Sequence, residues 1–363
     1  MGRNPATLLI LLMIVVCLLV TQFYSPYSTS YKAVSPAKTV EWKYILYWTQ
    51  MFGRPDFNLG LGSDIFRGCP VSNCYATDNK SYLPVDRFDA ILFHGVEYSI
   101  KLHGRPKVRS QHQYYVYSSQ ESPLNTLQFP NLTDFYNWTM TYRLDSDIVR
   151  PYGFYEKTKA DYDPPSIEEL QRRPFKIAWM VSNCETLSLR KVLYEKLNRH
   201  IKVDVYGHCG NITCLKQNSE KCYRFLEENY KFYLSFENSI CKDYVTEKMY
   251  NILQKNLVPI VYGGADYEKN TPPHSVIDVK KFKTVKELAE YINFLDKNPE
   301  EYLKYFEWKN RFIVRTSNER TLCSLCSKLN EPIKHKSYAS IFKWWNIEET
   351  CQYGSTLPKI LYT

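Results

Sequence analysis

The arrangement of apolar and polar residues predicts an α/β chain. Short aromatic and β-branched runs, typical of strands buried on both faces of a parallel sheet, occur at 44–48, 90–94 and 114–119. Beyond residue 175, similar runs alternate with segments of helical periodicity, which implies further parallel pairing. The expected strands there are 176–182, 203–207, 232–236 and 257–263, and the expected helices are 187–198, 220–228 and one that follows Thr246. The Pro-rich, charged stretch 161–174 is the predicted linker between the two halves.

The stretch 231–254, KFYLSFENSICKDYVTEKMYNILQ, combines a strand, a polar loop and the start of a helix. Phe232–Phe236 has the composition of a buried strand, a polar loop extends to Tyr244, and Thr246 is a suitable helix N-cap. Backbone N–H groups at a helix N-terminus bind anions, and Lys248 adds a positive charge where the helix dipole disfavours one. These residues alone leave two interpretations open, a phosphate partner or a solvated surface lysine.

An uncharged run at 4–31, with its apolar centre at 8–20, predicts a membrane segment. We expect a cytosolic tail at 1–6, a transmembrane signal anchor at 7–24 and a stem at 25–40 that is rich in Ser, Tyr and Pro. A helix of about 18 residues is about 27 Å long, enough for a thin bilayer. The alternative is a cleaved signal peptide. The anchor is favoured because no small-x-small cleavage site follows closely and the next residues are aromatic.

Composition and length narrow the class of protein. A chain of 363 residues exceeds what one hydrophobic core usually serves, so two domains are expected. Aromatic residues make up 15 %, which argues against a disordered chain. The net charge of +9 suits an anionic substrate, and the absence of a Lys/Arg block argues against nucleic acid as a partner.

Cysteines and glycosylation motifs indicate a secretory compartment. N-x-S/T motifs occur at Asn79, Asn131, Asn137 and Asn211. Of 11 cysteines one, Cys17, lies in the apolar run, so ten remain that could form disulfides. The spacings within Cys69/Cys74 and Cys323/Cys326 would also fit a four-thiolate zinc site, but an oxidising lumen favours disulfides.

The strings SFENS (235–239) and DYVTEK (243–248) together resemble the donor-binding signature of the α1,3-fucosyltransferases, glycosyltransferase family 10. These enzymes transfer fucose from GDP-fucose to N-acetylglucosamine. The resemblance extends from about Trp42 to about Trp345, and it is closest to the core-modifying enzymes of invertebrates and plants.

This resemblance implies a GT-B-like α/β fold, in which two Rossmann-type domains face each other across a cleft. The expected parts are an acceptor-side domain at 41–160, the linker at 161–174, a GDP-fucose-binding domain at 175–330 and a tail at 331–363 that packs back. The resemblance also implies that the C-terminal cysteine pair, Cys323 and Cys326, bonds to two cysteines of the N-terminal domain. The expected location is the Golgi membrane, as a single-pass type II protein with its catalytic part in the lumen.

Fucosyl transfer needs a base for the acceptor hydroxyl. Glu121, in SSQESP after the third expected strand, matches the acid of the ESP motif that acts as base in the resembled enzymes. Without the resemblance, a glutamate that caps a turn before Pro123 is the preferred interpretation. His94 and Glu97 lie where the family has an HH-R-E/D run. Because Gly95 and Val96 replace its second His and its Arg, neither residue is assigned a catalytic role.

The departing diphosphate needs a positively charged contact. The resemblance assigns this role to Arg190, since arginine binds phosphate bidentately, although a surface arginine on an amphipathic helix is the commoner case. The other positions that match donor contacts of the family are Tyr152, Ser182, Asn183, Tyr233, Asn238, Tyr244, Val245, Thr246, Glu247 and Lys248. The carboxylate of Glu247 suits sugar hydroxyls or the positive charge that develops on the fucose.

Two rival functions remain at this stage. A metal-dependent transferase would use Asp145-Ser146-Asp147 as a D-x-D motif, but three residues carry little information. A secretory lectin would share the disulfides and aromatic residues, yet it would have no use for a diphosphate contact. We therefore expect no required cofactor, with a divalent cation at most stimulatory, and GDP-fucose as the donor substrate.

The acceptor divides the family into two classes, N-acetyllactosamine ends and the innermost N-acetylglucosamine of N-glycans. Three features favour the second class. The cysteines at 184, 209, 214, 222, 241 and 351 resemble the core-modifying enzymes, as does the tail WWNIEETC. In addition, Arg54 occupies the position where Lewis-type enzymes carry a glutamine against galactose, which changes the hydrogen bonds offered there.

Overall fold

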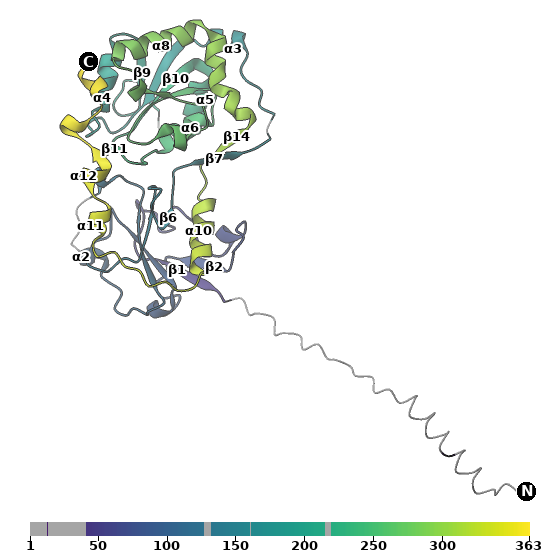
Figure 1. The fold of residues 1–363 in the computed structure, drawn as a ribbon, viewed down its shortest axis with the longest axis vertical. Coiled ribbons are helices and arrows are strands. Elements are labelled where there is room, and N and C mark those ends of the chain that lie inside the picture. Colours follow the sequence, from purple (N-terminus) through teal and green to yellow (C-terminus); the bar gives the residue numbers. More distant parts are fainter. Residues whose placement is uncertain (1–12, 14–40, 127–131, 160, 215–218) are drawn as a thin grey trace, which may run out of the picture. The chain divides into compact units, whose positions relative to one another are not determined.

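The computed structural model describes Met13 and residues 41–363, except for 127–131, 160 and 215–218 (Figure 1). It divides into two units, Met1–Glu41 and Trp42–Thr363, and the elements described belong to the second unit, apart from Met13. Among the residues described, no helix is both long and apolar enough to cross a membrane. Apart from Met13, the predicted tail, anchor and stem lie outside the described residues.

The first half of this unit contains a six-stranded parallel sheet of order β2-β1-β3-β4-β5-β6. Three of its strands match the sequence prediction and are fully or largely buried, namely β1 (Lys43–Tyr47), β3 (Ala90–His94) and β4 (Tyr114–Ser119). The others, β2 (Cys74–Thr77), β5 (Trp138–Thr141) and β6 (Ile148–Val149), were not predicted. They have two to four residues each, too few for a periodic pattern to emerge. A short helix, α2 (Ile100–His103), follows β3.

The second half contains a five-stranded parallel sheet of order β13-β12-β10-β8-β9. Strand β10 (Tyr230–Phe236) is central and almost entirely buried, as its aromatic sequence predicts. Its neighbours are β8 (Phe175–Met180), β9 (Val203–Tyr206), β12 (Val258–Tyr262) and β13 (Ile277–Asp278). The helices of this half are α4 (Arg190–Asn198), α5 (Ser219–Asn229), α6 (Glu247–Leu253), α7 (Tyr267–Asn270), α8 (Val285–Lys297) and α9 (Pro299–Leu303).

Two of the segments that cross between the halves pair with each other. Strand β7 (Phe154–Lys157) and strand β14 (Phe312–Arg315) form a separate antiparallel ladder. The stretch expected to be a linker holds a helix, α3 (Ile167–Arg172), whose N-terminus is closed by a capping box between Ser166 and Glu169.

Helix α10 (Glu319–Leu329) belongs to the first half, although the sequence analysis included it in the C-terminal domain. Figure 1 shows α10 beside the strands of the six-stranded sheet. Its buried residues Leu322 and Leu325 belong to the core of that sheet. Two disulfides, Cys69–Cys323 and Cys74–Cys326, attach it there. They confirm the pairing implied by the resemblance, and because all four sulfurs are bonded, this set cannot supply the thiolates of a zinc site.

The C-terminal segment runs along both halves (Figure 1). It contains α11 (Ile341–Trp344), α12 (Ile347–Thr350) and β15 (Cys351–Gln352). Strand β15 pairs with β11 (Ile240–Cys241), which lies inside the stretch predicted to be a polar loop. A disulfide joins Cys241 to Cys351, and two further disulfides, Cys184–Cys209 and Cys214–Cys222, lie in the second half.

The glycosylation motifs differ in their accessibility. Asn79 and Asn211 are exposed, and Asn131 lies outside the described residues. The side chain of Asn137 is partly buried at the start of β5, where its Nδ2 donates to the carbonyl of Lys336 at 2.7 Å and its Oδ1 accepts from the Tyr115 amide at 2.7 Å. A glycan on Nδ2 would compete with the bond to Lys336, and the partly buried side chain leaves it little room, so we expect Asn137 to be unmodified.

Candidate active site

The site lies where the carboxyl ends of strands from both sheets meet. Parallel strands present functional groups at this end. Glu121 follows β4 of the first half, Ser182 and Asn183 follow β8, and the loop after β10 begins with Glu237. Hydrogen bonds join the halves here: Ser122 Oγ donates to Ser239 Oγ at 2.7 Å, and the Leu144 amide donates to Asp243 Oδ2 at 3.2 Å.

The carboxylate of Glu121 is partly buried and contacts the loop after β10. Its Oε2 accepts from Asn125 Nδ2 at 3.3 Å and from the Tyr244 hydroxyl at 3.5 Å. Its own main-chain carbonyl accepts from Ser119 Oγ at 3.2 Å. The acid that the sequence nominates as base therefore lies directly against the segment that carries the donor signature.

Three tyrosines surround Glu121. Tyr142 and Tyr244 are 2 % and 1 % exposed, and their ring centroids are 4.8 Å apart. Tyr152 donates through its hydroxyl to the carbonyl of Gln120 at 2.6 Å. Burial raises the pKa of each phenol well above its usual value, with a further contribution from the negative charge of Glu121. These hydroxyls therefore stay protonated; those of Tyr152 and Tyr244 donate hydrogen bonds, whereas the Tyr142 hydroxyl is buried without a partner in the described part of the chain.

A buried glutamate anchors the start of α6. Glu237 is 1 % exposed, and its Oε1 accepts from the Thr246 amide at 2.8 Å and from Thr246 Oγ1 at 2.9 Å. Lys248 Nζ lies 3.2 Å from Glu237 Oε2 and 3.3 Å from Glu247 Oε1. Burial raises the pKa of the Glu237 carboxyl, and the two carboxylates raise the pKa of Lys248 although burial opposes them.

This arrangement corrects one part of the sequence interpretation. The Thr246 amide is bonded to Glu237, and the Lys248 amide reaches Thr246 Oγ1 at 3.5 Å. Two of the N–H groups expected to receive an anion are thus already satisfied within the protein. The Lys248 side chain, 23 % exposed, is an ion-paired residue at the edge of the site and not a solvated surface lysine.

Arg190 begins α4 but points into the protein, with 3 % exposure. Its Nη1 donates to the Phe236 carbonyl at 2.9 Å and its Nη2 to the Asn183 carbonyl at 2.7 Å. Burial lowers the pKa of the guanidinium, and the charge of Glu237 opposes this effect. Arg190 thus ties the ends of β8 and β10 together. Its Nε is buried without a protein partner.

The other predicted donor residues fall into three groups. Ser182, Asn183 and Glu247 are exposed at the carboxyl edge. Tyr152, Asn238 and Lys248 are partly buried, and Asn238 Oδ1 is a buried acceptor without a protein partner. Tyr233, Tyr244, Val245 and Thr246 are buried. Tyr233 is part of the core between β8 and α6, so the structure does not bring it to the surface of the site.

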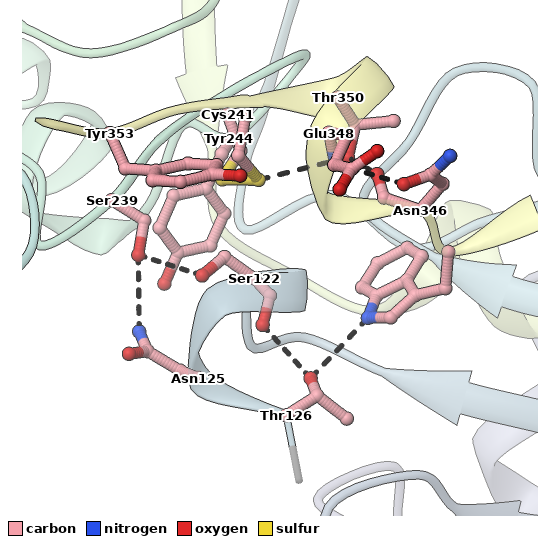
Figure 2. The surroundings of a disulfide bond; sticks show 12 residues. Ser122, Asn125, Thr126, Ser239, Cys241, Tyr244, Asn346, Glu348, Thr350 and Tyr353 are labelled. Carbon is pink, nitrogen blue, oxygen red and sulfur yellow. Dashed lines mark hydrogen bonds between the residues drawn. A yellow bond between two sulfur atoms is a disulfide. The ribbon is translucent and has the colours of Figure 1, made fainter. Parts of the chain in front are cut away.

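The sequence alone suggested no role for Glu237, Ser239 or Asn125. Glu237 bonds the start of α6, and Asn125 bonds Ser239 across the two halves (Figure 2). Glu237 and Ser239 are letters of the SFENS string itself, so the signal was present, but only the fold reveals what they contact.

Both acids of the D-x-D string are held by basic residues. Asp145 accepts from Arg143 through both oxygens, at 2.8 Å and 2.5 Å. Asp147 Oδ1 accepts from Lys336 Nζ at 2.6 Å, and its Oδ2 accepts from the Tyr338 hydroxyl at 2.8 Å. Both carboxylates therefore form ion pairs and hydrogen bonds within the protein, with partners in the first half and in the C-terminal segment.

The edge of the six-stranded sheet has a pocket of about 540 Å³ at the ends of β1 and β3. Its lining includes Trp48, Asp78, Lys80, Glu97 and His103. Arg54 lies next to Pro55 of this lining, is exposed, and is paired with Asp56 through two hydrogen bonds of 3.1 and 2.8 Å.

The departure from the family's histidine run has a steric cause. A Cβ on Gly95 would lie 2.4 Å from the ring of Tyr117, so no larger residue fits while that ring is present. His94 is fully buried and bonds Glu97 Oε2 through Nδ1 at 2.7 Å, and burial lowers its pKa. Glu97 Oε2 also accepts from the Phe52 amide at 2.9 Å, which orders the loop beside Arg54.

Comparison with known proteins now identifies the family. The model described as "Fucosyltransferase, N-terminal" matches residues 41–153, and the model described as "Glycosyltransferase family 10 (fucosyltransferase) C-term" matches residues 170–344. The chain belongs to glycosyltransferase family 10. This membership confirms the resemblance that SFENS and DYVTEK suggested.

Relatives within family 10 are similar over most of this chain. Alpha-(1,3)-fucosyltransferase C of Drosophila melanogaster is 38 % identical, with 83 % of this chain and 77 % of that protein covered. Glycoprotein 3-alpha-L-fucosyltransferase A of the same species is 37 % identical, over 82 % and 60 %. The 3-galactosyl-N-acetylglucosaminide 4-alpha-L-fucosyltransferase FUT3 of Bos taurus is 35 % identical, over 83 % and 81 %.

A solved structure within the same fold is the "Crystal Structure of alpha1,3-Fucosyltransferase with GDP-fucose". It is 18 % identical, covers 84 % of this chain and 96 % of that chain, and superposes with a TM-score of 0.52. At this identity the match concerns the fold, which is the α/β arrangement of two parallel sheets expected for the family 10 chain.

Proposed function

We propose that this protein is an inverting α1,3-fucosyltransferase that moves L-fucose from GDP-fucose to O3 of N-acetylglucosamine. The observation that carries the proposal is the contact between Glu121, at the carboxyl end of β4, and the donor-signature loop through Tyr244. This contact brings the proposed base on one half next to the proposed donor segment on the other.

The reaction is a single displacement. The acceptor O3 forms a bond to C1 of fucose, its proton passes to Glu121, and the bond from C1 to the β-phosphate oxygen breaks with its electron pair leaving on GDP. Attack opposite the leaving group inverts C1. In this proposal Lys248, at the edge of the site, supplies positive charge for the diphosphate, Arg190 adds to that charge from its buried position, and the exposed Glu247 stabilises charge on the sugar.

The test of this function is transfer from GDP-fucose by the full chain, compared with Glu121→Gln. The variant should bind GDP like the parent and lose about 10²–10⁴-fold in turnover, since that is the usual contribution of a general base. Glu290→Gln, an exposed side chain on α8, is the matched control and should be fully active. Turnover of Glu121→Gln at the parental rate would remove Glu121 from the mechanism.

For the acceptor we propose the innermost N-acetylglucosamine of N-glycans. The six cysteines that resemble the core-modifying enzymes form three disulfides, Cys184–Cys209, Cys214–Cys222 and Cys241–Cys351. The Cys241–Cys351 disulfide holds the donor-signature loop in place. The cysteines shared with the core-modifying enzymes therefore help to shape the proposed site. The cavity beside Arg54, about 540 Å³, offers room for further sugars of a branched acceptor.

The second candidate is Lewis-type transfer to lactosamine ends, and it is favoured by relatives named as 4-galactosyl-N-acetylglucosaminide 3-alpha-L-fucosyltransferases, 36 % and 35 % identical to this chain. The deciding assay offers GDP-fucose together with an Asn-linked biantennary glycopeptide and free N-acetyllactosamine. Fucose on the Asn-linked sugar supports the core assignment. Fucose only on the lactosamine overturns it.

The cellular setting belongs to the same proposal. We infer a Golgi membrane protein that is anchored by residues 7–24 and carries its catalytic part in the lumen, because the sequence has an apolar run ahead of a glycosylation- and disulfide-bearing chain. Extraction with alkaline carbonate tests the anchor: the full chain should stay with the membrane pellet. Release of the intact chain into the supernatant would contradict it.

A further inference from the structure

Three tyrosines form an aromatic cluster at the β1–β2 edge of the first half. Tyr44 of β1 lies directly opposite Tyr75 of β2, with ring centroids 6.3 Å apart. The ring of Tyr82, from the loop after β2, stacks on Tyr75 at 4.8 Å and 10° and lies 6.2 Å from Tyr44. One face of the Tyr82 ring is therefore covered, yet 44 % of the residue is exposed. A ring that is held in place and open to solvent can bind a ligand with an apolar face.

The glycosylation motif at residues 79–81 immediately precedes this ring. The Tyr82 amide donates to the Asn79 carbonyl at 3.1 Å and closes a turn, whose first and fourth Cα atoms lie within about 7 Å of each other. The Ser81 amide donates to Asn79 Oδ1 at 2.9 Å, and the Asn79 amide donates to Thr77 Oγ1 at 3.0 Å. The backbone and the side chain of Asn79 are thus fixed beside the residue that carries the ring.

The side-chain nitrogen of Asn79 is available for a sugar. Asn79 is exposed, and among the residues that the structure describes no hydrogen bond reaches its Nδ2. Asn137 differs, because its Nδ2 donates to the Lys336 carbonyl at 2.7 Å. Asn211 is exposed as well, but the four residues on either side of it include no Tyr, Phe or Trp. Asn79 therefore combines an open attachment point with an adjacent aromatic ring.

The charged neighbours of Asn79 do not cover that ring. Asp78 and Lys80 both line the pocket at the ends of β1 and β3, and Lys80 Nζ lies 3.9 Å from the centre of the Trp48 ring. This pocket is the competing place for a glycan on Asn79. Its rim beside the motif already holds these two charged side chains, whereas the outer face of the Tyr82 ring is open.

We propose that the first sugar of an N-glycan on Asn79 packs against the open face of Tyr82, so that the tyrosine cluster is a binding site for the protein's own glycan. This sugar is β-linked N-acetylglucosamine, whose C–H bonds at C1, C3 and C5 point to one face and make that face apolar. The negative face of an aromatic ring attracts such C–H groups. The inference rests on the proposed lumenal setting, since N-glycans are attached only in the secretory pathway.

The experiment measures how fast peptide-N-glycosidase F releases each glycan from the folded full chain. The chain is produced in cells that make no GDP-fucose, so that no core fucose blocks the reaction. We expect release from Asn79 to be roughly two- to tenfold faster in Tyr82→Ala than in the parent, the range that one aromatic stacking contact supports. Release from Asn211 should not change. Tyr82→Phe keeps the ring and should show the parental rate at both positions.

Phe294→Ala is the matched control. Phe294 is 47 % exposed and stacks on Tyr291 at 6.3 Å, but it lies on α8 in the second half. Its removal should leave release from Asn79 and Asn211 unchanged. Urea unfolding gives an independent readout: Tyr82→Ala should lower the midpoint more in the glycosylated chain than in an Asn79→Gln background, because the contact exists only when the sugar is present.

The outcomes separate this inference from the setting on which it rests. Peptide mapping that finds both Asn79 and Asn211 bare would refute the lumenal setting. A glycan on Asn211 with none on Asn79 would overturn the inference alone, and so would equal release from Asn79 in the parent and in Tyr82→Ala. If Tyr82→Ala fails to fold, Tyr82→Leu keeps the apolar bulk without the ring, and the same faster release is expected.

Discussion

The two disulfides that attach α10 to the first half should not contribute additively to stability. Cys69–Cys323 and Cys74–Cys326 have sequence separations of 254 and 252 residues, and they lie side by side. Either bond alone closes the long loop through the second half. The second bond then closes only a small ring, which consists of segments 69–74 and 323–326 and the two disulfides.

The magnitudes follow from loop-closure entropy. Closing a loop of about 250 residues destabilises the unfolded chain by roughly 5.5 kcal/mol at 25 °C, and closing a ring of about ten residues by roughly 3 kcal/mol. Cys69→Ala/Cys323→Ala or Cys74→Ala/Cys326→Ala should therefore each cost about 3 kcal/mol. Removing both bonds should cost about 8 kcal/mol, which is comparable to the whole stability of many folded domains.

Urea unfolding of the oxidised full chain and of the three variants measures these costs, with circular dichroism as the probe. The refuting result is a pair of equal single-bond costs that add up to the cost of removing both. Additivity would mean that the bonds act through local packing in the native state, where Cys74 and Cys326 are fully buried, and not through the long loop.

Three further predictions concern charge and polar burial. Lys248→Ala and Arg190→Ala should each weaken GDP binding about tenfold or more by calorimetry, as each removes a positive charge from the donor edge of the site; unchanged affinity in both variants would locate the nucleotide elsewhere. Burial lowers the pKa of Lys309 to about 8. The unfolded chain keeps this proton up to about pH 10.5, so the unfolding free energy of the parent should rise between pH 8 and 10.5, by at most about 3 kcal/mol relative to Lys309→Met. An unfolding free energy that differs between parent and variant by the same amount at every pH would contradict this. Asn137→Gln should lower the urea midpoint without changing the glycan mass, whereas a loss of glycan mass would show that Asn137 is modified after all.

Much of the fold could be predicted from local pattern. The aromatic strands at 90–94 and 114–119 appear with the expected bounds, and β10 is the central buried strand of its sheet. The unpredicted strands are short, or pair with segments far away in sequence. Strand β11 has two residues and pairs with β15, more than 100 residues later, so nothing near Ile240 in the sequence indicates it.

For the site, the sequence determined which residues are present and the tertiary structure decided what each can reach. The strings SFENS, DYVTEK and ESP are local, and they marked Glu121 and the donor loop. Whether a marked side chain faces solvent depends on packing by distant segments. Arg190 points at two carbonyls, and Tyr244 meets Glu121 across 123 residues of chain. Such contacts arise because two sheets present their carboxyl ends to each other and the C-terminal segment holds them, an arrangement that no local pattern of residue types encodes.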